Sequence, residues 1–230
     1  MYKYILFDID NTLLDFNAAE NRAIRATFQQ YGIAETEENV SLYSQINLSF
    51  WKRLERKEIT RDMLWSGRFL RLAEVLNIPM DAERAVEMNR FYLSELGLCA
   101  LPIDGAEQLL HVLTDRGYDL YAVTNGNANV QYTRLEASNF KQYFKGLFIS
   151  EEIGCSKPEA SFFAYVFQKV GSSNLRDYLI VGDSLTSDIA GGINSGIDTC
   201  WYNPYGVPNT IGTEPTYTVR NYGEILDRLK

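Results

Sequence analysis

The sequence has few of the residues that histidine- and thiol-based chemistry requires. Its 230 residues include one histidine and three cysteines. His111 falls within an apolar helical pattern, so a serine–histidine triad is not expected. Cys99, Cys155 and Cys200 lack the paired spacing of a zinc site or a disulfide framework, and we interpret them as reduced packing residues. These shortages argue against triad and zinc chemistry.

Positive charge and long apolar runs are also scarce. Lysine and arginine total 22 against 30 aspartates and glutamates, which gives a formal net charge of -8. Nucleic acid polymers and anionic membranes are therefore not expected partners, and an anionic substrate would need cations supplied locally. No stretch approaches the ~18–20 apolar residues of a membrane span. We expect a cytoplasmic protein, and the pattern leaves its oligomeric state open.

A short apolar stretch near the N-terminus ends in two carboxylates. Tyr4 to Phe7 are aromatic or aliphatic, and Asp8, Ile9 and Asp10 follow directly. This pattern is typical of a buried strand that delivers acidic groups to a sheet edge, although an ordinary acidic turn would look the same. Residues two apart on a strand share a face, so Asp8 and Asp10 are expected to point the same way. Like charges this close favour a bound cation.

Two regions with different patterns follow. From about residue 15 to 95 the chain is helix-compatible without clear strands, and Thr60 and Asp81 carry the signatures of helix starts. From Pro102 onward, apolar strands alternate with helices, which is typical of parallel pairing with right-handed crossovers. The sequence predicts an α/β fold. We expect a Rossmann-like three-layer core with a parallel sheet at residues 1–14 and 100–230, and an all-helical cap inserted at residues 15–99.

Polar groups follow each expected strand at its carboxyl end, where open α/β sheets bind ligands. Thr124-Asn125-Gly126 precedes a helix start and is expected to form an anion cradle. Pro158 suits the first position of a helix, which would hold Lys157 at a helix start. Asp183 and Asp188 follow the next strand. Each piece alone is an ordinary turn or helix start, so it is their order and placement that indicate a site.

Together these segments resemble the four motifs of the haloacid dehalogenase-like (HAD) hydrolase superfamily, with a helical cap inserted after the first motif. The resemblance implies a phosphatase that forms an aspartyl-phosphate, with Asp8 as the nucleophile. It implies that Asp10 protonates the leaving oxygen and then takes a proton from the attacking water. Dehalogenases of the superfamily lack an acid at the position of Asp10, so its presence favours a phosphatase.

The resemblance also implies how the site holds its ligands. Mg²⁺ would bind the side chains of Asp8 and Asp183 and the backbone carbonyl of Asp10. Asp188 would lie behind these ligands or reach a metal-bound water. The phosphoryl oxygens and their charge would be held by three residues, Thr124, Asn125 and Lys157.

Substrate class is the least constrained expectation. Gln131, Arg134-Leu135 and the segment 150–158 resemble the pyrimidine-type 5′-nucleotidases, so we expect a small phosphorylated metabolite, first among them nucleoside 5′-monophosphates. The alternatives are a phosphatase for sugar phosphates, phosphoglycolate or pyrophosphate, a dehalogenase, and a non-catalytic phosphate-binding module. Fold-level similarity does not decide between them.

The cap is expected to select the leaving group and to close over the site by flexing near residues 15–17 and 97–102. Its aromatic residues could stack a base and its arginines could bind a phosphate or carboxylate. The simpler interpretation places the aromatics in the cap interior and the arginines in solvent. The residues concerned are Phe50, Trp51, Trp65, Phe69, Arg22, Arg53 and Arg68.

Overall fold

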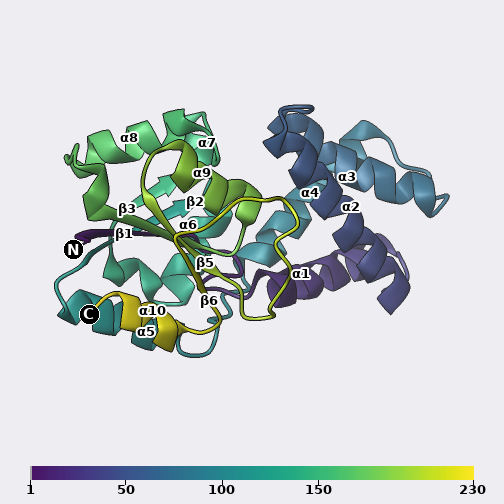
Figure 1. The fold of residues 1–230 in the computed structure, drawn as a ribbon. Helices are drawn as coiled ribbons and strands as arrows, with labels where there is room; N and C mark the ends of the chain where they lie inside the picture. Colours follow the sequence, from purple (N-terminus) through teal and green to yellow (C-terminus); the bar gives the residue numbers. More distant parts are fainter. Residues whose placement is uncertain (1) are drawn as a thin grey trace. The chain divides into compact units, whose positions relative to one another are not determined.

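The computed structural model describes residues 2–230 and divides into two compact units. One unit comprises the residues up to Asp15 together with Ala100–Lys230, and the other is Phe16–Cys99 (Figure 1). The first contains a parallel sheet and the second is helical. The predicted α/β fold with an inserted helical cap is confirmed. In the part of the chain described, no helix is long and apolar enough to cross a membrane.

A six-stranded parallel sheet in the order β3-β2-β1-β4-β5-β6 forms the centre of the first unit. β1 lies in the middle and pairs with β2 on one side and β4 on the other. The strand order reverses at β1, and open α/β sheets bind ligands at such a switch point. The strands are β1 (Tyr4–Phe7), β2 (Asp119–Thr124), β3 (Phe144–Ile149), β4 (Tyr178–Gly182), β5 (Asp198–Tyr202) and β6 (Tyr217–Val219).

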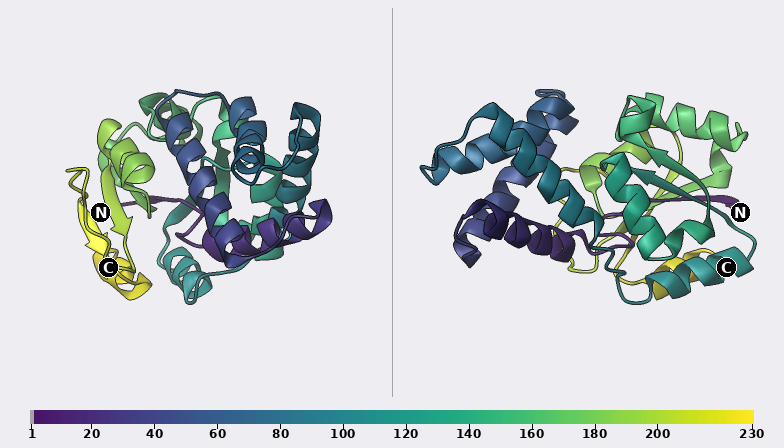
Figure 2. Two further views of the ribbon diagram at one scale, coloured as in Figure 1. Left: turned by 90° about the vertical axis from the view of Figure 1, so that its right-hand side faces the viewer. Right: turned by 180° about the vertical axis from the view of Figure 1, so that it is seen from behind.

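Helices cover both faces of the sheet because side chains alternate along each strand. Ile5 and Phe7 join one hydrophobic cluster with α5 (Ala106–Asp115) and α10 (Tyr222–Arg228). Leu6 joins the opposite cluster with α8 (Ala160–Val170) (Figures 1 and 2). The predicted three-layer core is confirmed. The remaining helical segments of this unit are α6 (Ala128–Ala137), η1 (Phe140–Tyr143), α7 (Ser150–Ile153), η2 (Leu175–Asp177), η3 (Leu185–Ile189) and α9 (Ala190–Asn194).

One helix start differs from the prediction, and another segment has π-helical geometry. α8 begins at Ala160 with Glu159 as its N-cap, so Lys157 lies in the preceding loop and the prediction of Pro158 at the first helical position is wrong. The Glu159 carboxylate accepts a hydrogen bond from the Ser156 backbone N–H at 3.3 Å, which ties that loop together. η3 is a π-helical turn, because the Ser184 carbonyl accepts from the backbone amides of both Asp188 and Ile189.

The second unit consists of α1 (Phe16–Tyr31), α2 (Glu37–Glu55), α3 (Arg61–Val75) and α4 (Ala82–Gly97) (Figure 2). The side chains of Thr60 and Asp81 each accept a hydrogen bond from the third helical amide, which confirms the two predicted helix starts. Tyr43, Phe69 and Tyr92 pack their rings together in the interior, with centroids 5.3, 5.4 and 5.8 Å apart. The interpretation of Phe69 as an interior residue is confirmed.

A polar network crosses the interior of the helical unit. Arg68, only 1% exposed, donates to Asn47 Oδ1 at 2.7 Å and to Asn89 Oδ1 at 2.6 Å. The Glu20 carboxylate accepts from Asn47 Nδ2 at 2.6 Å and from Ser44 Oγ at 2.6 Å. The interpretation of Arg68 as a solvent-facing arginine is wrong, because its guanidinium is buried and donates to two amide side chains inside the unit.

Candidate active site

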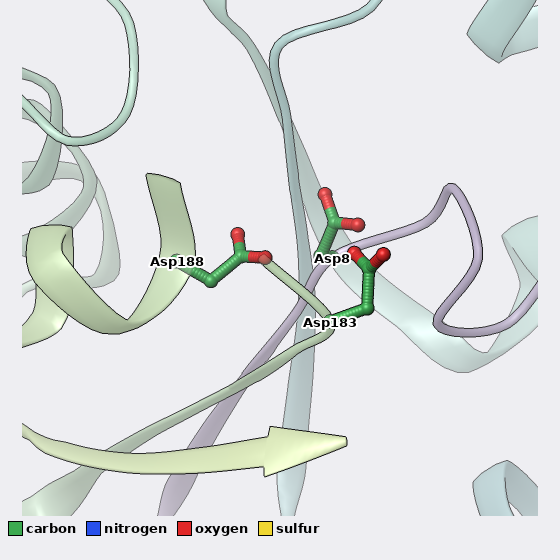
Figure 3. Close-up of side chains that lie close together, drawn as sticks. All are labelled: Asp8, Asp183 and Asp188. Carbon is green, nitrogen blue, oxygen red and sulfur yellow. The ribbon is translucent and has the colours of Figure 1, made fainter. Parts of the chain in front are cut away.

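Three carboxylates meet beyond the carboxyl ends of the central strands. Asp8 follows β1, Asp183 follows the adjacent strand β4, and Asp188 lies in η3. Each offers an oxygen, and these oxygens all lie within 4.8 Å of one another. Figure 3 shows the Asp8 and Asp183 carboxylates side by side, with Asp188 extending toward them from its helical turn. The parallel register of β1 with β4 brings together residues that are far apart in the sequence.

The Lys157 ammonium lies between two of these carboxylates. Its Nζ atom donates to Asp8 Oδ1 at 2.6 Å, to Asp188 Oδ1 at 2.7 Å and to the Val123 carbonyl at 2.7 Å. The side chain is 1% exposed, so these contacts replace water around the charge. The structure therefore places the Lys157 ammonium between Asp8 and Asp188, inside the carboxylate cluster.

The charges in this cluster shift one another's protonation. Burial raises the pKa of Asp8 to about 7, an effect that the Lys157 charge opposes and the Asp188 and Asp10 charges reinforce. Burial, with the charge of Asp8 next, raises the pKa of Asp183 well above its usual range. Burial alone would lower the pKa of Lys157, but the Asp188 and Asp8 carboxylates outweigh it and raise that pKa. The cluster contains more negative charge than Lys157 neutralises.

These residues fit a divalent metal ion. The cluster presents only oxygen donors, which Mg²⁺ prefers, and its three carboxylates carry more negative charge than the Lys157 ammonium offsets. Three oxygens, one each from Asp8, Asp183 and Asp188, lie close enough together to hold one ion. The expectation that Asp188 lies behind the ligands or reaches a metal-bound water stays a prediction. The binding of the Asp10 backbone carbonyl to the metal stays a prediction.

The side chain of Asp10 lies outside this group. β1 ends at Phe7, so the regular alternation of the strand does not extend to Asp10, and the expectation that Asp8 and Asp10 point the same way stays a prediction. A tight turn follows in which the Ile9 carbonyl accepts from the amides of Thr12, Leu13 and Leu14. The Asp10 carboxylate instead accepts hydrogen bonds from Gln131 and Arg134 of α6.

Asn125 has a role that sequence reasoning missed. Its Nδ2 atom donates to the Lys157 carbonyl and its Oδ1 atom accepts from the Lys157 amide, both at 2.9 Å. The side chain thus positions the loop that contains Lys157. The two residues are 32 apart in the sequence, and no local pattern signals the pairing. A direct contact of Asn125 with a phosphoryl oxygen stays a prediction.

The start of α6 is occupied by the protein's own carboxylate. Glu151 of α7 accepts from the Ala128 amide at 2.6 Å and from Asn127 Nδ2 at 3.0 Å. Thr124 Oγ1 accepts from the Gly126 amide at 3.1 Å. A carboxylate at this helix start complements the helix dipole. The anion cradle expected of Thr124-Asn125-Gly126 stays a prediction. Contact between Thr124 and a phosphoryl oxygen stays a prediction.

Two neighbours hold the acidic groups in place, and neither was expected from the sequence. Gly182 at the end of β4 lies so close to Asp188 that a Cβ atom there would be 2.2 Å from Asp188 Oδ2. Trp201 of β5 donates its indole N–H to the Asp183 carbonyl at 2.8 Å. The G-D-S sequence around Asp183 is the only local signal of this close packing.

The histidine and the cysteines lie outside the cluster. His111 lies on α5, where its exposed ring is 3.4 Å from Asp115. Cys99 and Cys200 are buried, Cys155 is partly buried, and all three are free thiols. Burial raises the pKa of Cys200 to about 12, which is unfavourable for a thiolate.

Comparison with known proteins identifies the fold and its chemistry. The family model described as "haloacid dehalogenase-like hydrolase" matches residues 2–196. The chain belongs to this family. Its predicted resemblance is confirmed, and so is the expectation of a hydrolase. The match contains the strand ends that deliver Asp8, Asp183 and Asp188.

This HAD chain matches several relatives over nearly the full length of both proteins. It is 40% identical to pyrimidine 5′-nucleotidase PynA of Streptococcus pneumoniae over 228 residues, covering 99% of this chain and 95% of that protein. It is 32% identical to pyrimidine 5′-nucleotidase YjjG of Escherichia coli, covering 97% and 96%. The crystal structure of the putative HAD-hydrolase YfnB from Bacillus subtilis, bound to magnesium, matches with a TM-score of 0.93 at 38% identity, covering 100% and 99%.

Proposed function

We propose that this HAD phosphatase hydrolyses nucleoside 5′-monophosphates, pyrimidine nucleotides first, with Mg²⁺ as its cofactor. The observation that carries the proposal is the cluster of Asp8, Asp183 and Asp188 around Lys157 at the switch point of the sheet. The two nucleotidase relatives and the magnesium-bound structure of a third relative support the substrate class and the metal.

The first step is attack by Asp8 on phosphorus. A bond forms between an Asp8 carboxylate oxygen and phosphorus as the bond to the 5′-oxygen of the nucleoside breaks. Asp10 gives a proton to that leaving oxygen, so the nucleoside departs as a neutral alcohol. The product on the enzyme is an aspartyl-phosphate, and the position of Asp8 directly after β1, a strand paired on both sides, supports a defined line of attack.

The second step is hydrolysis of the aspartyl-phosphate. Asp10, now deprotonated, takes a proton from a water molecule as that water attacks phosphorus. The bond between phosphorus and Asp8 breaks, releasing inorganic phosphate and restoring the Asp8 carboxylate. Protons and phosphoryl groups balance over the two steps, and the net reaction consumes one water.

Charge on the phosphoryl group must be neutralised during both steps. Lys157 contacts Asp8 directly, so its ammonium lies beside the phosphoryl group once that group is on Asp8. Thr124 and Asn125 are proposed to contact the phosphoryl oxygens as well. Bound Mg²⁺, held by Asp8, Asp183 and Asp188, would neutralise negative charge on the substrate and orient it.

The cap is proposed to choose the leaving group and to exclude water during transfer. Its two connections to the core are paired with each other inside the core unit. The Asp15 amide donates to the Leu101 carbonyl at 2.8 Å, and the Ile103 amide donates to the Leu13 carbonyl at 2.9 Å. This pairing supports the proposal that flexing is confined to the residues that follow Asp15 and precede Leu101.

The proposal is tested by phosphate release from a substrate panel in the presence of Mg²⁺ or EDTA. The panel contains pyrimidine and purine 5′-monophosphates, sugar phosphates, phosphoglycolate and pyrophosphate. We expect nucleoside 5′-monophosphates to be the best substrates, EDTA to abolish turnover, and Asp8→Asn to reduce it by at least ~10⁴-fold because the covalent route is lost.

The substrate panel tests the proposed substrate and the proposed mechanism separately. If another phosphomonoester ranks first and the reaction still requires Mg²⁺ and Asp8, the proposed substrate is wrong and the phosphatase mechanism holds. If no phosphate is released from any substrate by folded protein, the proposed function is overturned.

A further inference from the structure

The two side chains that bind Asp10 come from one turn of α6. Gln131 Nε2 donates to Asp10 Oδ2 at 2.6 Å, and Arg134 Nη1 forms an ion pair with Asp10 Oδ1. Residues three apart on a helix lie on the same side, so a single helical turn presents both donors. Each oxygen of the carboxylate therefore has its own donor, and the plane of the carboxylate is fixed.

Arg134 carries its charge at a buried position. Its side chain is fully buried, whereas the Asp10 side chain is 26% exposed. Burying a guanidinium is costly unless an opposite charge accepts its hydrogen bonds, and Asp10 supplies such a charge. The buried cation thus holds the carboxylate from the protein side and leaves its other side open to solvent.

The buried side chain of Gln131 lowers the stability of the folded protein. Its Oε1 atom is buried and has no hydrogen-bond partner among residues 2–230. An unsatisfied buried acceptor costs about 1–3 kcal/mol. Space for Gln131 also depends on Gly126, where a Cβ atom would lie 2.3 Å from Gln131 Nε2. The glycine after Thr124-Asn125 therefore accommodates the residue that binds Asp10.

We infer that Gln131 and Arg134 are positioning residues for Asp10, holding its carboxylate where it exchanges protons with the leaving oxygen and the attacking water. The inference rests on the proposed function, because it assigns these residues to the acid–base step of that reaction. Neither side chain contacts the substrate in this role. Their contribution is the orientation of a carboxylate that would otherwise rotate freely at a partly exposed position.

The inference predicts a dependence on the leaving group that a merely structural role would not produce. The 5′-oxygen of a nucleoside needs a proton as it departs, whereas p-nitrophenolate departs without one. The value of kcat/KM reports the steps through formation of the aspartyl-phosphate. Losing the orientation of Asp10 should therefore lower kcat/KM for the nucleotide far more than for p-nitrophenyl phosphate.

The experiment compares Gln131→Met, Arg134→Lys and Arg134→Met with the unmodified enzyme on both substrates. We expect kcat/KM for the nucleotide to fall by about 10²-fold in Gln131→Met and Arg134→Met and less in Arg134→Lys, and values for p-nitrophenyl phosphate to fall by less than about tenfold. Arg116→Met is the control, since Arg116 donates to the Leu226 and Leu229 carbonyls near the C-terminus. It should leave both values unchanged. Thermal unfolding confirms that each variant is folded.

A second comparison uses the Asp10→Asn background. If Gln131 and Arg134 act through Asp10, adding Arg134→Lys or Gln131→Met to Asp10→Asn should lower kcat/KM no further. Losses that multiply in the double variants, or equal losses on the two substrates in the single variants, would overturn the inference while leaving the phosphatase activity intact. An unmodified enzyme that hydrolyses neither substrate would instead overturn the proposed function, and this inference with it.

Discussion

At the site, the Asp188 carboxylate packs directly against Gly182. Asp188 Oδ2 accepts from the Ser184 amide at 3.1 Å while Oδ1 binds Lys157, so each oxygen has a protein partner. The carboxyl group lies against the backbone of Gly182, and no side chain fits between them. The absence of a Cβ at this position is what allows Asp188 to reach Lys157 and the other carboxylates.

We predict that Gly182→Ala displaces Asp188 and lowers both stability and turnover. The added methyl group should cost about 1–3 kcal/mol of unfolding free energy, as overpacking does. Turnover per folded molecule should fall by more than about tenfold, because Asp188 loses its contact with Lys157. Denaturant unfolding and phosphate release measure the two effects.

Gly192→Ala is the matched control for this variant. A Cβ atom at Gly192 would lie 2.5 Å from Thr199 Cγ2, so a similar loss of stability is expected. Gly192 does not contact the carboxylate cluster, and turnover per folded molecule should be retained. Equal turnover in the two alanine variants would show that the close packing at Gly182 has no bearing on the site.

Neighbouring strands support one another's carboxyl ends. β5 pairs with β4, and Gly182 is in register with Trp201. The hydrogen bond from the Trp201 indole to the Asp183 carbonyl continues this support one residue beyond the end of β4. The ring is 6% exposed, so the bond is shielded from water. Strand β5 thus stabilises the backbone that presents Asp183, although it contributes no side chain to the cluster.

We predict that Trp201→Phe weakens Mg²⁺ binding. The change removes the indole N–H and leaves the Asp183 carbonyl without this donor. Loss of a partner that orients a metal ligand typically costs about 10–100-fold in affinity, and a loss in that range is expected here. Titration calorimetry with Mg²⁺ measures it without substrate. Trp65→Phe, a change in the cap, should leave the affinity unchanged, and the proposal for Trp201 is wrong if the two variants bind equally.

On the scale of the whole molecule, each unit has a buried charged centre of its own. The core unit holds Lys157 with its carboxylates, and the cap unit holds the network of Glu20 and Arg68. Glu20 and Arg68 have no direct ion pair among the described residues, and Asn47 links them by binding both. Burial raises the pKa of Glu20, while the hydrogen bonds from Ser44 and Asn47 and the charge of Arg68 lower it in part.

We predict that this network makes cap stability fall as pH rises. Because the pKa of Glu20 is raised in the folded state, the folded protein holds the proton more tightly than the unfolded chain. The resulting stabilisation is full below the ordinary glutamate pKa of about 4.3 and is lost as pH rises through the raised value. Hydrogen exchange of α1–α4 at a series of pH values, compared with Glu20→Gln, measures it. Parallel pH profiles for the two proteins would contradict the prediction.

Three features could be predicted from the sequence. They are the alternation of strands and helices, the polar groups after the strands, and the helix caps at Thr60 and Asp81. Each depends on residues close together in the chain, because side-chain periodicity and capping are local. They were sufficient to predict the parallel α/β core, the helical insertion and the clustering of Asp8 with Asp183. The start of α8 was missed because a loop contact, that of Glu159 with Ser156, precedes it.

Only the tertiary structure decided which partner each polar group takes. Asp10 binds Gln131 and Arg134 of α6, Asn125 binds the backbone of Lys157, and Arg68 is buried among amides. The residues in these contacts lie between 21 and 124 positions apart in the sequence. Such pairings follow from how the strands register and where each helix packs, and sequence spacing does not encode either. The chemistry was therefore visible in the residue types, and its arrangement came from the fold.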